Sequence, residues 1–213
     1  MSLYILLLVF TAAILHASWN LLAKKTKGGI PFIWLQYVAG TILCIPFLFF
    51  QKGCEYILYS QPLLWFSLGS AVLHLGYFIV LQKGYRSADL SVVYPLARGS
   101  GPLFSSMAAI LFLQEHLKLS STIGLFLIIA GVFVITGLSF KKERNRTVMT
   151  GIIYGVLTGF FIGLYTINDA IAVKRYAVTP LILTLGTNLF STVLLSPFVF
   201  TQKDEIKREI REH

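Results

Sequence analysis

The run STIGLFLIIAGVFVITGLSF, residues 121–140, decides the class of fold. It holds 20 residues and no Asp, Glu, Lys, Arg or His. An α-helix of about 20 apolar residues crosses the hydrocarbon core of a bilayer, whereas a transmembrane β-strand needs about half that length and alternates with a period of two. This run is about twice as long as such a strand, and its apolar and polar residues do not alternate. It therefore predicts a membrane-spanning helix.

Six further apolar runs of similar length lie on either side of it. The seven predicted spans are residues 3–22, 30–50, 62–81, 90–113, 121–140, 148–167 and 180–201. Of the 213 residues, 56% are hydrophobic and 13% are charged, about half the charged share of a soluble domain. The N-terminus has no basic segment before its apolar run, so we expect a retained helix rather than a signal peptide. We predict an all-α polytopic membrane protein with seven transmembrane helices.

The basic residues indicate an orientation in the plasma membrane. The formal charge is +9, but the 18 Lys and Arg residues form short clusters between the spans. No basic face interleaved with aromatic residues is available, so we expect the lipid bilayer as a partner and no nucleic acid. Alternate loops collect 13 and 4 of these residues, and Arg98 lies inside a span. Since the richer side faces the cytoplasm, the count predicts an external N-terminus.

An internal repeat is visible at an offset of about 150 residues. PFLFFQK at 46–52 recurs as PFVFTQK at 197–203, and the pair Lys24-Lys25 corresponds to Lys174-Arg175. The alternative is that this similarity arose by chance, because the ends of membrane spans favour Pro, Phe and Lys. A repeat of five spans, an odd number, would place its second copy inverted in the membrane, as in many secondary transporters.

The repeat divides the chain into four parts. We expect a five-helix unit at 1–140, a charged linker at 141–147, the first two helices of a second unit at 148–201 and a charged tail at 202–213. Such a chain would be an incomplete ten-helix fold. The other three helices would be absent, or a homodimer or another partner chain would supply them.

Several motifs resemble one transporter family. The matching segments are AILHASWN at 13–20, ADLSVVYPL at 88–96, 102–104, 111–115, and the spaced Gly124 and Gly131. In their order they resemble the EamA-type branch of the drug/metabolite transporter superfamily. The resemblance implies two inverted five-helix repeats that move small metabolites or amino-acid-like compounds by alternating access. It also implies a cytoplasmic N-terminus, which disagrees with the loop count.

Arg98 leads the candidate substrate-binding residues. A charge in the middle of a span costs about 2.5–3.5 kcal/mol unless it faces a polar cavity. Tyr94, Arg98, Gly101 and Ser105 share one helical face. The run RGSGP at 98–102 favours a locally loosened helix whose freed amides help the guanidinium to bind an anion. A structural ion pair or snorkelling is the alternative role of Arg98.

Aromatic and titratable residues in other spans complete the predicted substrate site. His16 and Asn20 lie one turn apart beside Trp19, and His16 is a candidate proton carrier. Hydrogen bonding of His16 and Asn20 to another helix is an equally good structural explanation. A polar stripe of Ser67, Ser70, His74 and Tyr77 follows helical spacing in the third predicted span.

Two carboxylates are candidates for coupling or gating. Asp169 lies one turn after Tyr165, itself a candidate substrate-binding residue, and could pair with Arg98 or carry a proton. An interfacial position is the alternative, because two basic residues follow closely. Glu115 follows the fourth span and fits a helix end at the water boundary.

Glycines recur at every fourth residue of the sixth predicted span. They are Gly151, Gly155, Gly159 and Gly163. This spacing predicts a smooth helix face on which another helix packs closely.

The pattern as a whole favours a secondary transporter. The alternatives are a truncated, nonfunctional or partner-requiring fragment of such a carrier and, further off, an intramembrane enzyme or a sensor. The sequence contains no Ser/His/Asp set, metal-binding His pair or phosphate-binding loop, so we expect no catalytic residues, metal or cofactor.

Overall fold

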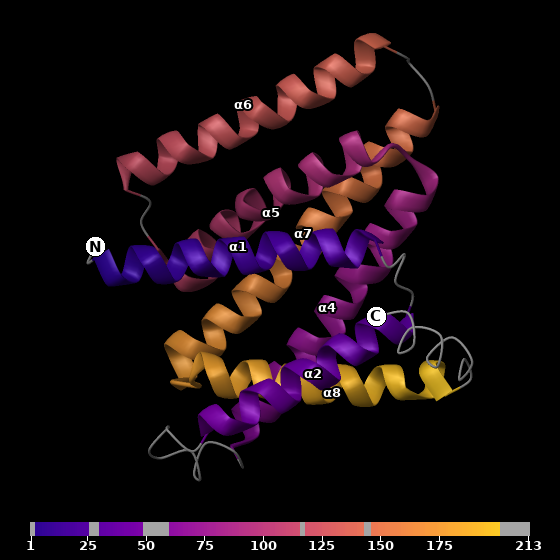
Figure 1. The fold of residues 1–213 in the computed structure, drawn as a ribbon. Coiled ribbons are helices and arrows are strands. Elements are labelled where there is room, and N and C mark those ends of the chain that lie inside the picture. The colour runs from indigo at the N-terminus through magenta and orange to yellow at the C-terminus, as the bar shows by residue number, and fades with distance from the viewer. Residues whose placement is uncertain (1–2, 26–29, 49–59, 116–117, 143–145, 201–213) are drawn as a thin grey trace.

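Seven α-helices and no strand are found in the computed structural model, which describes residues 3–25, 30–48, 60–115, 118–142 and 146–200 (Figure 1). The helices are α1 (Leu3–Lys25), α2 (Ile30–Leu48), α4 (Gln61–Ser87), α5 (Leu90–Leu113), α6 (Leu119–Lys142), α7 (Arg146–Tyr176) and α8 (Pro180–Phe200). Among the described residues, α2, α4, α5, α7 and α8 are long and apolar enough to cross a membrane. In α1 and α6 the apolar stretches found are shorter, Leu3–Ala12 and Leu119–Gly131. The prediction of a helical, multi-pass membrane protein is confirmed.

Two helices extend well beyond the spans predicted from hydropathy. α4 continues six residues past Leu81, and α7 continues nine residues past Ile167. Hydropathy falls where charged residues begin, but Ala, Lys and Arg are good helix formers and prolong the helix. α7 ends only before Ala177, whose φ of 54° is left-handed. Asp169 and the basic pair after it therefore lie within a helix.

The glycine face of α7 packs along α5. A Cβ placed on Gly151, Gly155, Gly159 or Gly163 would contact Val92, Leu96, Ser100 or Phe104 in turn, always 59 positions earlier in the chain. The constant offset shows that the two helices run parallel and in register. The close packing predicted from the glycine spacing is confirmed, and it requires glycine because no side chain fits between the backbones.

Other helix pairs run antiparallel. Along α4, Gly69, Gly76 and Gly84 lie against residues of α7 whose numbers decrease, from Asn168 to Tyr154. On α8 the numbers also decrease as α2 advances: Trp34 Nε1 donates to the Thr192 carbonyl and to Ser196 Oγ, both at 3.1 Å, and a Cβ placed on Gly40 would meet Asn188. These directions are those expected if each helix crosses the bilayer once, because the single helix α6 separates the parallel α5 and α7.

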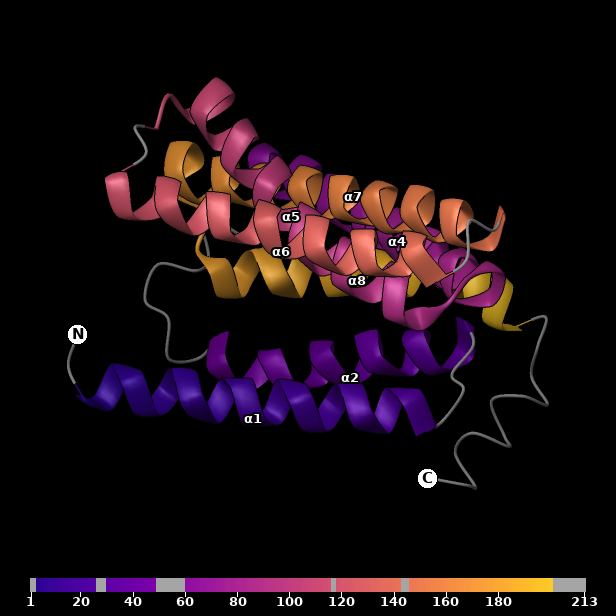
Figure 2. The ribbon, with the colours of Figure 1, turned by 90° about the horizontal axis from the view of Figure 1, so that it is seen from above.

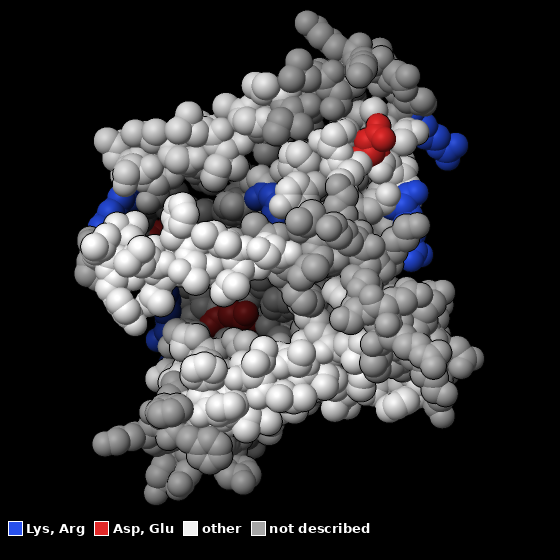
Figure 3. Space-filling view, viewed as in Figure 1, with Lys and Arg blue, Asp and Glu red and all other residues white. Residues whose placement is uncertain are grey.

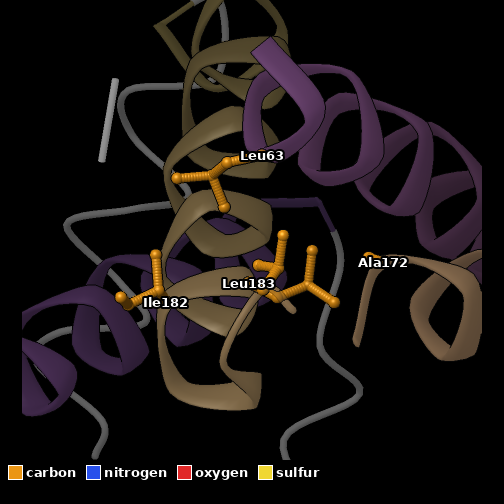
Figure 4. Close-up of a cluster of buried hydrophobic side chains, with 5 residues drawn as sticks. Leu63, Ala172, Ile182 and Leu183 are labelled. Atoms are coloured by element: carbon orange, nitrogen blue, oxygen red, sulfur yellow. The ribbon is translucent and has the colours of Figure 1, made fainter. Parts of the chain in front are cut away.

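An apolar cluster joins three helix ends. Leu63 at the start of α4, Ala172 near the end of α7, and Ile182 and Leu183 at the start of α8 are buried together with Val178 (Figure 4). Viewed from above, α1 and α2 lie on one side of the molecule and α4, α5, α6 and α7 on the other, with α8 between (Figure 2).

Large apolar side chains cover the outside. Trp65 and Leu111 are each 71% exposed, and Leu127 is 68% exposed. Lipid tails solvate such a surface, whereas in water it would cause association.

Candidate functional site

Charged atoms lie deep on both sides of α1. Figure 3 shows basic atoms beside α5 and acidic atoms in the hollow between α1 and the α2–α8 pair. Among the described residues, Arg98 of α5 and Asp169 of α7 are the charged side chains that lie about two turns or more from either end of their helix. A charge this far from the end of a membrane-spanning helix needs a polar environment.

Arg98 contacts an aromatic ring rather than a carboxylate. Its guanidinium carbon lies 5.6 Å from the centroid of the Tyr94 ring, one turn earlier on α5, and both side chains are exposed. No described carboxylate pairs with Arg98. The cation is thus held by a cation–π contact and is open to a ligand.

The predicted face of α5 is only partly exposed, and the predicted loosening of this helix is wrong. Gly101 is buried against Ile162 of α7, so it does not share the open environment of Arg98. The helix is also continuous through Pro95 and Pro102 and is not locally opened. A proline lacks the amide N–H, so Pro102 deprives the Arg98 carbonyl of its helical donor and frees an acceptor rather than donors.

Three predicted residues from two helices form one aromatic cluster. The rings of His74 and Tyr165 stack at 4.0 Å between centroids with an interplanar angle of 24°. Tyr77 meets the same Tyr165 ring edge-on at 6.1 Å. Tyr165 is in electrostatic range of both Arg98 and Asp169.

Tyr37 of α2 belongs to this group, and sequence reasoning missed it. Its phenol lies within electrostatic range of Tyr77 and close to Ser191 of α8. The signal available was a tyrosine in the middle of an apolar run, next to Gln36.

The polar stripe predicted on α4 divides between two environments. His74 and Tyr77 reach the aromatic cluster, but Ser67 is fully buried against α8, with its Cβ 2.8 Å from a Cβ placed on Gly186. Ser67 therefore serves helix packing and does not line the same site.

Asp169 is held by a neighbouring amide. Asn168 Nδ2 donates to Asp169 Oδ1 at 3.1 Å and to the Phe66 carbonyl of α4 at 3.0 Å. The register of α5 on α7 places Arg98 level with Leu157, and the 12 residues from there to Asp169 span about 18 Å. The two charges therefore occupy different depths and form no ion pair.

Glu115 lies apart from this region. It forms an ion pair with Lys174, and Arg175 donates to the Phe112 carbonyl at the end of α5. Glu115 follows Arg98 by 17 residues, about 25 Å along the axis. The structure therefore joins Glu115 to the helix end, as expected, and does not bring it to Arg98.

The other candidates lie in α1. His16, Trp19 and Asn20 belong to this helix, but their side chains lie outside the described residues. In the part of the chain that is described, no three His, Cys, Asp or Glu side chains gather as metal ligands do.

The apolar helices and their packing define a multi-pass membrane protein. The model of the EamA-like transporter family matches residues 3–137, which is more than half of the chain. The protein belongs to this family.

One curated relative is an uncharacterized protein of Methanocaldococcus jannaschii. It is 33% identical over 106 residues, which are 49% of this chain and 75% of the relative. No solved structure matches the chain.

Proposed function

We propose that this protein is a secondary transporter of the plasma membrane that moves small anionic or amino-acid-like metabolites by alternating access. The substrate binds in the hollow between Arg98 and the aromatic cluster of His74, Tyr77 and Tyr165. In this proposal Tyr94, Tyr37 and the α1 residues His16, Trp19 and Asn20 complete the site.

The observation that carries the proposal is Arg98 itself. A guanidinium that lies two turns inside a helix and pairs with no described carboxylate is costly in a membrane unless water or a ligand solvates it. An anionic group of the substrate would supply that partner through charge-assisted hydrogen bonds. The aromatic rings beside it would pack against the rest of a small molecule.

Inverted repeats are the architecture that we propose for alternating access. The family match ends at residue 137, close to the end of the first expected unit at 140. The relative is about 141 residues long (106 divided by 0.75), which is the length of one such unit. We propose that helices beyond those of this sequence complete the second unit, from a further segment or from a partner chain, including a second copy. The alternative to a carrier that transports by itself is a helix bundle that transports only together with this partner.

Orientation is part of the proposal. The loops at the end of α1, α4 and α6 carry more Lys and Arg than those at the end of α2, α5 and α7. We propose that the richer side faces the cytoplasm and that the N-terminus is external.

Transport by matched variants tests the role of Arg98. A metabolite library screened by thermal shift first supplies the substrate, since a ligand raises the melting temperature in proportion to its affinity. Uptake of that substrate into proteoliposomes is then measured for Arg98→Ala and Arg98→Lys. Arg86→Ala, which removes an exposed arginine at the end of α4, is the control.

We expect Arg98→Ala to lose at least about tenfold in uptake, Arg98→Lys to retain part of it, and the control to match wild type. Full transport by a folded Arg98→Ala protein would remove Arg98 from the site.

A further inference from the structure

The neutral form of His74 has a defined tautomer. Its Nδ1 lies 2.8 Å from the Ser70 carbonyl oxygen and 3.3 Å from Ser70 Oγ, one turn earlier on α4. A carbonyl oxygen can only accept a hydrogen bond, so Nδ1 carries the proton. In the neutral ring Nε2 is then unprotonated and able to accept a proton.

No described residue forms a hydrogen bond with Nε2. The described residues give His74 two partners at Nδ1 and a stacked ring on one face, Tyr165, and none of them bonds Nε2. Tyr165 in turn lies within electrostatic range of Arg98. His74 thus carries a proton acceptor that no described residue engages, on a ring stacked against the tyrosine that senses the cation of the proposed anion site.

We propose that His74 Nε2 is a proton-binding site that is coupled to anion binding at Arg98. The proposal rests on the function proposed above and adds the group that takes the proton. A proton on Nε2 makes the imidazole a cation stacked on the Tyr165 face, where a cation–π contact favours it. The hollow then holds two cations and attracts an anion more strongly.

The surrounding charges set the sign of the coupling. α7 contributes Tyr165 and Asp169, α5 contributes Arg98 and Tyr94, and α8 contains no ionisable residue within its described length. Tyr77 on α4 and Tyr37 on α2 are neutral near pH 7 in their ordinary state. Arg98 repels the added proton and Asp169 attracts it, so an anion bound at Arg98 cancels the repulsion and favours protonation.

By linkage, proton and anion each strengthen binding of the other by the same factor. Since the substrate is unidentified, benzoate serves as the probe: it is an aromatic carboxylate that stays ionised from pH 6 to pH 8. We expect benzoate to bind wild-type protein in nanodiscs at least about tenfold more tightly at pH 6 than at pH 8. We expect this ratio to fall below about twofold in His74→Gln and His74→Phe.

His74→Phe keeps a ring against Tyr165 and provides a second variant if His74→Gln does not fold. An unchanged pH ratio in a folded variant overturns the coupling but leaves anion binding at Arg98 in place. Failure of wild type to bind benzoate at both pH values overturns the anion site and the coupling together.

Nitrogen-15 NMR of histidine-labelled protein tests the proton site without a ligand. The signals of His74 are those that disappear in His74→Gln. We expect the neutral ring to carry its proton on Nδ1 and the cationic ring, formed on acidification, to carry protons on both nitrogens. A neutral ring protonated on Nε2, or a ring that takes up no second proton on acidification, overturns the proposal.

Discussion

Gly159→Ala should separate α5 from α7. The new methyl carbon would lie 2.9 Å from the amide nitrogen of Gly101 and 2.9 Å from Ser100 Cβ. Ordinary contact begins at 3.4 Å, so the backbones must move apart by about 0.5 Å. A gap of this size forfeits about a quarter of the dispersion energy of the atoms that lose contact.

The Ser100 hydroxyl must move as well. It lies where the methyl group would be placed, and it donates to the Leu96 carbonyl at 2.6 Å. Losing that bond costs about 0.5–1.5 kcal/mol, and overpacking costs about 1–3 kcal/mol. Alanine regains about 1 kcal/mol of helix propensity over glycine. We therefore expect the free energy of unfolding to fall by about 2 kcal/mol.

Gly124→Ala in α6 is the matched control. Nothing lies within 4 Å of a Cβ at Gly124, so this substitution should leave stability unchanged or raise it by up to about 1 kcal/mol. The assay is unfolding in mixed detergent micelles with increasing SDS, followed by circular dichroism. If Gly159→Ala is as stable as Gly124→Ala, the tight packing of α5 on α7 is refuted.

Three further substitutions probe the helix ends and the site. Ala177→Gly should raise stability by about 1 kcal/mol in thermal unfolding, because an L-residue at φ 54° is strained; no gain would argue against that backbone conformation. Glu115→Gln should lower the free energy of unfolding by less than about 1 kcal/mol, because the side chains of Lys174 and Glu115 are 56% and 42% exposed. The loss should be smaller still in high salt. A loss above about 2 kcal/mol in the SDS assay would contradict this. Asn168→Ala should cost about 0.6–1.7 kcal/mol in the same assay by removing the bond to Phe66, and an unchanged stability would show that the bond contributes nothing.

Helix packing was predictable where it depends on a repeated residue type. The glycines of α7 give the face that meets α5, since close approach needs glycine at every turn. The sequence could not identify the partner helix, because parallel packing of α5 on α7 depends on contacts 59 residues apart. Helix ends were also missed, as hydropathy reports the apolar segment while α7 continues through Asp169 and Lys174.

Part of the candidate site could be predicted from single residues in the sequence. Arg98 stands out in an apolar run, and helical spacing alone puts it one turn from Tyr94. The stacking of His74 on Tyr165 joins two helices, so no local pattern reveals it. The prediction that α5 is loosened near its prolines was wrong for a physical reason. A membrane helix tolerates proline without a break when neighbouring helices support its backbone.

Transport through the hollow requires that water reaches Arg98, and cysteine labelling measures this access. In protein whose Cys44 and Cys54 are replaced by serine, single substitutions Tyr94→Cys and Phe126→Cys are reacted in nanodiscs with a membrane-impermeant thiol reagent. Both native side chains are exposed in the structure, but Tyr94 lies beside Arg98, whereas Phe126 belongs to α6, which lies at the edge of the helix bundle (Figure 1). We expect rapid labelling at position 94 and almost none at position 126, where lipid excludes the reagent. Equal protection at both positions would contradict an aqueous hollow around Arg98.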